Sequence, residues 1–145
     1  MKHQSIFFIL MLSFFSSSWA ASANEEQLLH HDVHVQHWIT TLQTNPLALA
    51  RKNAASFLGS LQDVRAVPVL IRALHDDQMV VRKEASIALG NVGDDQALRY
   101  LYEAKGTEVD QSVRREQDRA IEKIKARQDY QQKQKQRFLD LESTP

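Results

Sequence analysis

Apolar residues recur along most of the chain at intervals of three and four, the spacing that places them on one face of an α-helix. Between residues 50 and 61, for example, this spacing relates Ala50, Ala54, Leu58 and Leu61. The alternation of apolar and polar positions that is typical of strands is absent. The pattern predicts helices at residues 25–43, 46–60, 64–75, 78–91 and 95–105, and a further helix that starts near residue 109.

Turn-forming residues separate the predicted helices. Asn45 and Pro46 have the residue types of an N-cap and a first helical position. Asp63 and Asp94 are predicted to cap the helices that follow them. Three glycines are predicted to end helices, namely Gly59, Gly90 and Gly93.

The middle of the chain contains an internal repeat. Residues 50–74 align without gaps with residues 81–105 at a shift of 31, and nine of the 25 positions are identical. A weaker third copy begins at residue 113 with a shift of 32, and there Gln117 and Glu122 replace Ala85 and Gly90 of the second copy. We interpret these polar replacements as signs of a solvent-exposed terminal face. Because stacked helical repeats bury a shared core, the repeat predicts an all-α protein of about three helix pairs.

The stretch "VRKEASIALGNVGDDQALRYL", residues 81–101, resembles the short HEAT-like repeat of the phycobilisome-lyase type. The resemblance extends over roughly residues 28–124. It implies a short right-handed α-solenoid. It also implies an acceptor six residues before each repeat arginine that links neighbouring repeats. Three pairs fit this pattern and are expected to be structural, namely Asn45 with Arg51, Asp76 with Arg82, and Glu108 with Arg114.

In a solenoid the second helix of each pair lines the surface that usually binds partners. The outward positions of these helices fall into three columns across the repeats, and we predict that they form a concave partner-binding face. Ile87 is predicted to lie near its centre as an exposed apolar residue, with packing against a neighbouring helix as the alternative. The predicted face consists of Lys52, Asn53, Ser56, Lys83, Glu84, Ile87, Arg115, Glu116 and Arg119.

The stretch "HHDVHVQHW" contains four of the six histidines of the chain. His30, His34 and His37 form a stripe on the first predicted helix, and His31 lies on its apolar face. The stripe is interpreted as a solvated helix face, with a divalent-metal site as the alternative. Metal enzymes built from HEAT-like repeats have adjacent His-Glu pairs, and this sequence has no His-Glu dipeptide, so no metal or other cofactor is expected from the resemblance.

The N-terminal residues have the pattern of a secretory signal. Lys2 precedes an apolar run over residues 6–15, and Ala21 and Ala23 have the spacing that a signal peptidase reads. The run is about half of the roughly 20 residues that a membrane-spanning helix needs, so a retained anchor is the less favoured alternative. We therefore predict a cleaved signal at 1–23, a repeat domain at 24–125 and a polar extension at 126–145. The mature chain is expected to be periplasmic or secreted, without stable membrane insertion.

The composition of the chain excludes several classes of function. The chain has 18 basic and 18 acidic residues, which gives no overall bias toward nucleic acid, and no cysteine, which excludes disulfides and thiolate sites. No motif of nucleophilic or phosphate-binding catalysis is present. We therefore predict an exported, non-enzymatic interaction module that binds a protein and no nucleic acid. The alternatives are a metal-binding protein using the histidine stripe and a relative of the chromophore lyases.

The residues that lead into the polar extension, together with its first half, have a local positive charge. From Arg119 to Arg137 there are seven basic and two acidic residues. The extension is interpreted either as a soluble tail or as a contact for an acidic partner or anionic lipid headgroups.

Overall fold

The computed structural model describes residues 32–142 of the chain. Within this part every regular element is a helix, which confirms the all-α prediction. The elements are a helical segment at 32–44, α2 (Ala48–Leu61), a 3-10 turn η1 (Val64–Ala66), α3 (Val67–Ala73), α4 (Met79–Val92), α5 (Asp95–Thr107) and α6 (Gln111–Glu142). The chain divides into two compact units between Gln36 and His37, and the second unit contains α2 to α6.

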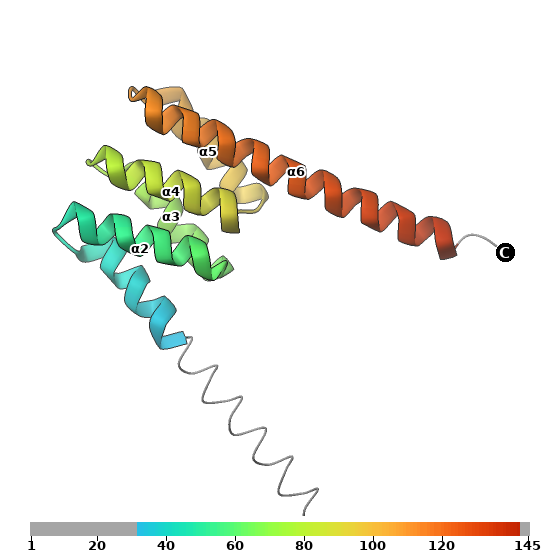
Figure 1. Cartoon of the computed structure of the whole chain (residues 1–145), viewed down its shortest axis with the longest axis horizontal. Coiled ribbons are helices and arrows are strands. Elements are labelled where there is room, and N and C mark those ends of the chain that lie inside the picture. Colours follow the sequence, from blue (N-terminus) through green and yellow to red (C-terminus); the bar gives the residue numbers. More distant parts are fainter. Residues whose placement is uncertain (1–31, 143–145) are drawn as a thin grey trace, which may run out of the picture. The chain divides into compact units, whose positions relative to one another are not determined.

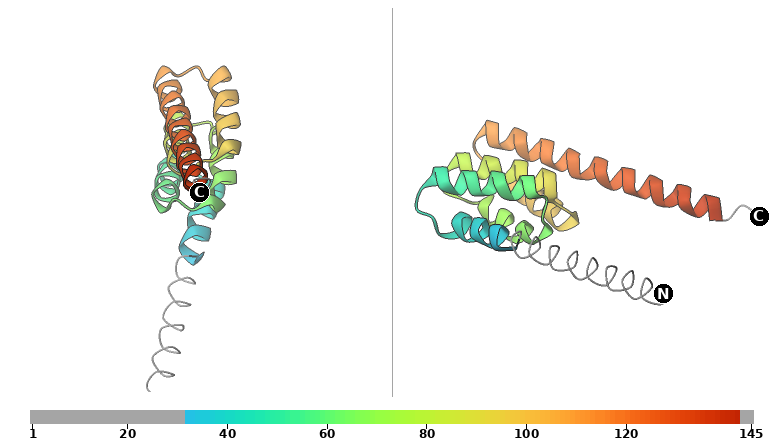
Figure 2. Two further views of the ribbon diagram at one scale, coloured as in Figure 1. Left: turned by 90° about the vertical axis from the view of Figure 1, so that its right-hand side faces the viewer. Right: turned by 60° about the horizontal axis from the view of Figure 1, so that its bottom comes forward.

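The second unit consists of stacked helix pairs in two layers (Figures 1 and 2). Helices α2, α4 and α6 lie side by side in one layer, with α4 in the middle and in contact with both neighbours. Helices α3 and α5 form the other layer, where α3 packs on α4 and α5 packs on α6. The arrangement is a short α-solenoid, as the repeat predicts.

The apolar positions of the repeat form the core between the two layers. Equivalent leucines of successive copies are fully buried, as are the alanines that allow the helices to approach closely. Burying one leucine side chain stabilises a fold by about 1.5–3 kcal/mol, so this row supplies a large part of the packing energy. The core includes Ala54, Leu58, Leu70, Ala85, Leu89, Leu101, Val113 and Ile124.

Two of the three predicted helix-ending glycines have a different role. Gly59 and Gly90 lie inside α2 and α4, two residues before the last residue of each helix. A Cβ atom on Gly59 would lie 2.7 Å from Cα of Ala88, and one on Gly90 would lie 3.0 Å from Cα of Ala120. These glycines are therefore required for close contact between neighbouring second helices. Only Gly93 follows the prediction, as the C-cap of α4.

The helix starts are predicted correctly at the two aspartates and wrongly at Asn45. Asp63 and Asp94 cap η1 and α5 by accepting backbone N–H groups. Helix α2 instead begins at Ala48, and Asn45 Oδ1 accepts a hydrogen bond from the N–H of Leu47 at 3.0 Å. This bond closes a local turn of the kind that asparagine favours, and the helix starts only after that turn.

The predicted solvent exposure of the two polar replacements in the third copy is confirmed for Glu122 and wrong for Gln117. The Glu122 side chain is 73% exposed, as expected for a terminal face. Gln117, in contrast, is fully buried, and neither of its amide atoms has a hydrogen-bond partner in the described structure. It lies on the inward face of α6, between the buried Val113 and Ala120. An unpaired buried amide of this kind costs about 1–3 kcal/mol.

Helix α6 continues without interruption past the predicted domain limit at residue 125 and ends at Glu142. Arg127 fixes it to α4 by donating to the carbonyl oxygens of Gly90, Asn91 and Gly93 at 2.7, 2.9 and 2.8 Å. Every residue from 129 to 142 is exposed. The described helices include none long and apolar enough to cross a membrane. The predicted signal at 1–23 lies outside the described residues.

Candidate functional site

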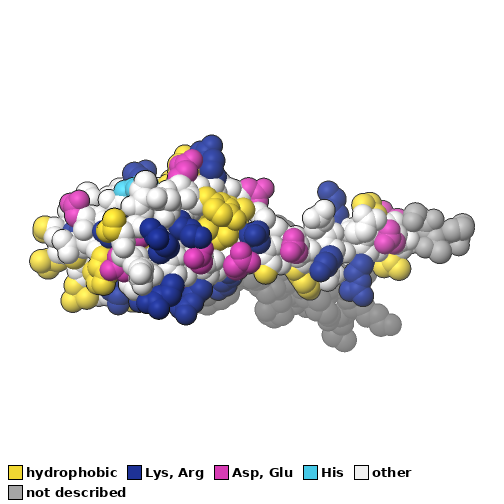
Figure 3. All heavy atoms as spheres, turned by 90° about the horizontal axis from the view of Figure 1, so that it is seen from above, with side chains coloured by type: hydrophobic (Ala, Val, Ile, Leu, Met, Phe, Trp, Pro, Cys, Tyr) yellow, Lys and Arg dark blue, Asp and Glu magenta, His cyan; other side chains and the backbone are white. Residues whose placement is uncertain are grey.

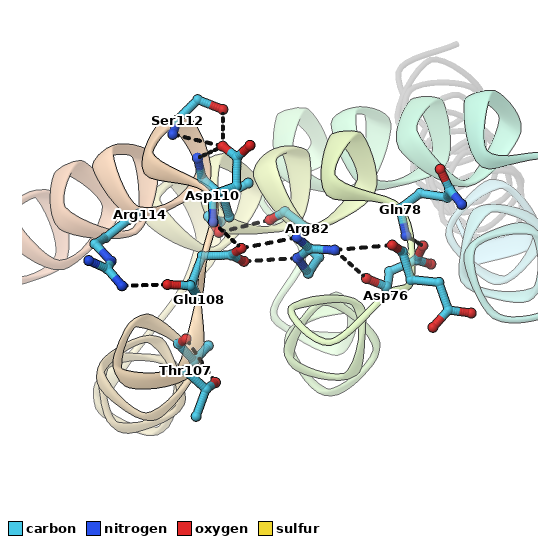
Figure 4. Close-up of polar contacts among 12 residues, drawn as sticks. Asp76, Gln78, Arg82, Thr107, Glu108, Asp110, Ser112 and Arg114 are labelled. Atoms are coloured by element: carbon cyan, nitrogen blue, oxygen red, sulfur yellow. Dashed lines mark hydrogen bonds and ion pairs between the residues drawn. The ribbon is translucent and has the colours of Figure 1, made fainter.

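A ladder of arginine–carboxylate pairs joins the successive repeats (Figure 4). Arg51 donates from Nε and Nη2 to the carboxylate of Asp76 at 2.7 and 2.8 Å. Arg82 donates in the same way to the carboxylate of Glu108 at 2.8 and 3.0 Å. Each pair links the second helix of one repeat to the turn before the second helix of the next, and each is bidentate, the strong geometry for this interaction.

Each repeat arginine also donates a hydrogen bond to the backbone carbonyl of the residue six positions before it. Arg51 donates to the backbone carbonyl of Asn45 at 3.0 Å, and Arg82 donates to that of Asp76 at 2.9 Å. Arg114 donates to the carbonyl of Glu108. The residue six positions before each arginine therefore positions the guanidinium through its backbone. In the second and third copies, the carboxylate at that position accepts hydrogen bonds from the arginine of the preceding repeat.

Burial and hydrogen bonding act in opposite directions on the pKa values of the two ladder carboxylates. The hydrogen bond from Arg82 holds the pKa of Glu108 below its usual value, against the opposing effect of burial. Burial acts to raise the pKa of Asp76, but the hydrogen bonds from Arg51 and from the N–H of Gln78 outweigh it and lower the pKa. Both carboxylates are thus held ionised by the repeat arginines. A groove of about 350 Å³ beside Arg82 and Glu108 is lined by these two residues and Asp76, together with neighbouring residues.

The ladder has two distinct ends. At its start, Asn45 uses its side-chain oxygen for the turn to Leu47. At its finish, Arg114 is exposed, and Figure 4 shows it on the far side of Glu108 from Arg82.

The residues predicted to form the partner-binding face lie on α2, α4 and α6, the three helices of one layer. Asn53, Ser56, Arg115 and Arg119 are exposed, whereas the other predicted members are partly buried. Glu116 pairs with Arg119 at 2.8 Å. Ile87 is partly covered on α4, which lies between α2 and α6, and its role as a contact residue stays a prediction.

Sequence reasoning missed one column of this face. Lys123 on α6 donates to Oδ1 of Asn91 on α4 at 2.7 Å. Ser60, Asn91 and Lys123 are related by the same shifts of 31 and 32 as the other columns, so the repeat contained the signal. We define the second-helix face by these columns together, namely Lys52, Asn53, Ser56, Ser60, Lys83, Glu84, Ile87, Asn91, Arg115, Glu116, Arg119 and Lys123.

The histidine stripe is only partly within the described residues. His30 and His31 lie outside them, and His34 and His37 are exposed. His37 contacts the edge of Trp38, which stacks on Phe57 with ring centroids 4.5 Å apart. In the described part of the chain no group of three or more His, Cys, Asp or Glu is placed to hold a metal ion. Because the alternative metal site depends on His30, it stays a prediction.

Comparison with known proteins identifies the repeat. The family of HEAT repeats matches residues 35–122, which is more than half of the chain. The chain belongs to the HEAT-repeat family. This result confirms the resemblance in "VRKEASIALGNVGDDQALRYL" and accounts for the stacked helix pairs.

The similar proteins are longer than this chain. Human deoxyhypusine hydroxylase is 39% identical over 66 residues, which are 44% of this chain and 22% of that protein. The bovine deoxyhypusine hydroxylase is 41% identical over 66 residues, with the same coverage. A crystal structure of epoxyqueuosine reductase with a tRNA-Tyr stem loop is similar with a TM-score of 0.50 and 31% identity, covering 52% of this chain and 20% of that one. The chain thus matches about a fifth of the length of these proteins.

These similarities correct one prediction and leave another unconfirmed. The prediction that the chain is not an enzyme is contradicted, because the relatives and the structural neighbour that share its repeats are named as enzymes. The prediction of no nucleic-acid partner is not confirmed, because the structural neighbour is in complex with a tRNA stem loop.

Proposed function

We propose that this HEAT-repeat chain is a scaffold that binds an acidic region of a protein partner on the second-helix face. The observation that supports the proposal is the charge of this face. The second-helix face has two acidic side chains, Glu84 and Glu116. It has five basic side chains from three helices, namely Lys52, Lys83, Arg115, Arg119 and Lys123. One of the two acidic side chains, Glu116, is already paired with Arg119. The face is therefore positive although the chain as a whole has a formal net charge of zero.

The packing beneath the face supports a binding role. The bidentate pairs of Arg51 and Arg82 and the close contacts at Gly59 and Gly90 set the spacing of α2, α4 and α6. The basic groups are consequently presented on a rigid surface, which lowers the conformational entropy lost on binding. Complementary charge across such a surface increases the association rate and selects among partners.

The proposal includes the location of the protein. The pattern of Lys2, the apolar run at 6–15 and the small residues at 21–23 favours export, so the partner would be a periplasmic or secreted protein. A protein partner is favoured over nucleic acid on this ground. Recovery of the chain from the cytoplasm with Met1 still attached would contradict this part of the proposal.

Photo-crosslinking in intact cells tests the partner-binding face. In one variant a photoreactive residue replaces Ser56, which is exposed on α2, and in a second variant it replaces the exposed Arg72 on α3. We expect a discrete crosslinked protein band from position 56 and none from position 72.

Charge reversal then tests the reason for binding. The pair Lys83→Glu and Arg115→Glu, which reverses two charges on the face, should abolish the band from position 56. The matched pair Arg72→Glu and Arg99→Glu changes the net charge equally on the other layer and should leave it intact. A band that survives reversal on the face, or that disappears on nuclease treatment, would reject an acidic protein partner.

A further inference from the structure

The C-terminal part of α6 is a helix without cover from the rest of the described chain. Arg127 and Gln128 hydrogen-bond to the repeats, through the end of α4 and through Asp95 of α5. The following 14 residues, 129–142, are all exposed and extend α6 by about 21 Å. Figure 1 shows this extension projecting beyond the ends of α4 and α5.

The extension exposes large apolar side chains. Tyr130 is 64% exposed, Phe138 is 62% exposed and Leu141 is 77% exposed. Figure 3 shows hydrophobic, basic and acidic side chains along the projecting helix. Large apolar side chains on an uncovered helix are available for contact with an apolar environment.

Charge is segregated around the extension. At 100° per residue, six side chains lie within about 140° of the helix circumference, and none of them is acidic. These six residues form what we call the extension face, namely Tyr130, Lys133, Gln134, Arg137, Phe138 and Leu141. The acidic residues Asp129, Asp140 and Glu142 lie on the rest of the circumference. Three of the four large apolar side chains of residues 129–142 and two of the three basic ones therefore lie together on one side, whereas Lys135 and Leu139 lie on the other.

We propose that the extension face binds the surface of an anionic lipid membrane. A helix of this kind lies in the headgroup region, with its aromatic and leucine side chains buried and its basic side chains beside lipid phosphates. The face is too small for a stable contact with a second copy of the chain, because such interfaces use about 20–30 residues on each side. A lipid surface needs no such area and satisfies both the apolar and the basic groups.

This proposal is independent of the acidic partner proposed for the second-helix face. It assigns the two positive surfaces different roles, one as a membrane contact and one as a protein contact. Because the extension is the C-terminal part of α6, it would hold the repeats at the membrane surface. Membrane contact of this kind is peripheral, in agreement with the absence of a spanning helix among the described residues.

Vesicle flotation tests the proposal on the full chain. Vesicles contain phosphatidylglycerol with phosphatidylcholine, or phosphatidylcholine alone. We expect binding to the anionic vesicles that falls steeply with added salt, and binding to the neutral vesicles that is at least fivefold weaker. All variants keep the same N-terminus, so any contribution of the apolar run at 6–15 is the same in each.

The extension offers a matched pair of variants. Arg137→Gln with Leu141→Ser removes one charge and one leucine from the extension face. Lys135→Gln with Leu139→Ser removes the same groups from the other side of the helix. The first pair should weaken binding to anionic vesicles about five- to tenfold, and the second should change it less than twofold. Because these residues are all exposed, circular dichroism should show both variants folded as the native chain.

The absence of cysteine allows a direct measure of depth. An environment-sensitive dye on Leu141→Cys should shift to the blue when anionic vesicles are added, and the same dye on Leu139→Cys should not. Equal shifts at both positions, equal losses in both variant pairs, or no binding of the native chain would overturn the proposal. The proposal would also be overturned if the chain bound polyglutamate or single-stranded RNA more tightly than the vesicles and lost this binding in the variant with Arg137→Gln and Leu141→Ser. That result would favour an acidic polypeptide or a nucleic acid as the partner.

Discussion

At the scale of single residues, two glycines decide how closely the repeats approach. Gly59 faces Ala88 and Gly90 faces Ala120, so each glycine meets an alanine of the following repeat. The third copy has Glu122 at the glycine position, and no further repeat follows it within the described residues. A side chain is thus tolerated at this position only where no helix packs against it.

Replacing these glycines should destabilise the fold although alanine is the better helix former. For Gly59→Ala the added methyl would lie 2.7 Å from Cα of Ala88, and overpacking of this kind costs about 1–3 kcal/mol. Gly106 is the matched control, because it lies in α5 and a Cβ there meets no atom within 4 Å. Gly106→Ala should stabilise the protein by up to about 1 kcal/mol. Urea unfolding of both variants measures the difference, and equal effects would contradict the packing role of Gly59.

At the scale of the elements, the arginine ladder holds neighbouring helix pairs in register. The Glu108 side chain is 3% exposed and that of Arg82 is 17% exposed, so this pair is shielded from solvent. Pairs on the surface differ in kind, as for Arg99 and Glu103, which lie 3.9 Å apart on α5 with both side chains largely exposed. The shielded pair bridges separate repeats, whereas the exposed pair lies within one helix, which makes the shielded pair the stronger determinant of stability.

Breaking the shielded pair should cost much more than breaking the surface pair. Arg82→Met leaves the Glu108 carboxylate buried without its partner, and we expect a loss of about 3 kcal/mol, the lower end of the range for buried pairs. Arg99→Met removes the exposed pair and should cost less than about 0.5 kcal/mol. Chemical unfolding at pH 7 measures both, and similar losses would show that the ladder is of minor importance.

The ladder also predicts the direction of the pH dependence. Because Arg82 lowers the pKa of Glu108 in the folded state, the unfolded chain binds the proton more tightly. The stability from this pair is complete above the unfolded pKa of about 4.3 and is lost as the pH falls through the lower folded pKa. In Glu108→Gln the fall in stability below about pH 4.3 should be shallower than in the native chain. An unchanged acid limb in that variant would rule out this contribution.

At the scale of the whole molecule, stability comes from contacts between adjacent repeats. Each second helix packs on its neighbour, and α6 closes the stack through Ile124 and Arg127. The extension contributes no buried residue after Gln128. The folding unit should therefore end near residue 128, although the helix continues to Glu142.

Truncation separates the folding unit from the extension. A chain that ends at Gln128 should keep a cooperative transition with a melting temperature within about 4 °C of the native value, because it loses no buried group. A chain that ends at Ile121 lacks Ile124 and Arg127, and it should melt far lower or fail to fold. Calorimetry distinguishes these results. A large loss in the longer chain would mean that the extension supports the repeats.

The sequence by itself determined the fold class, the repeat, the pairing of helices and the caps at Asp63 and Asp94, because these depend on local spacing and on residue type. Tertiary structure alone decided which groups meet across repeats. It assigned Gly59 to a helix contact, buried Gln117, partly covered Ile87 and connected Arg82 to Glu108, 26 residues later. The physical reason is that burial and close approach arise only when separate helices pack, and a single helix does not show which of its faces will be covered by a neighbour.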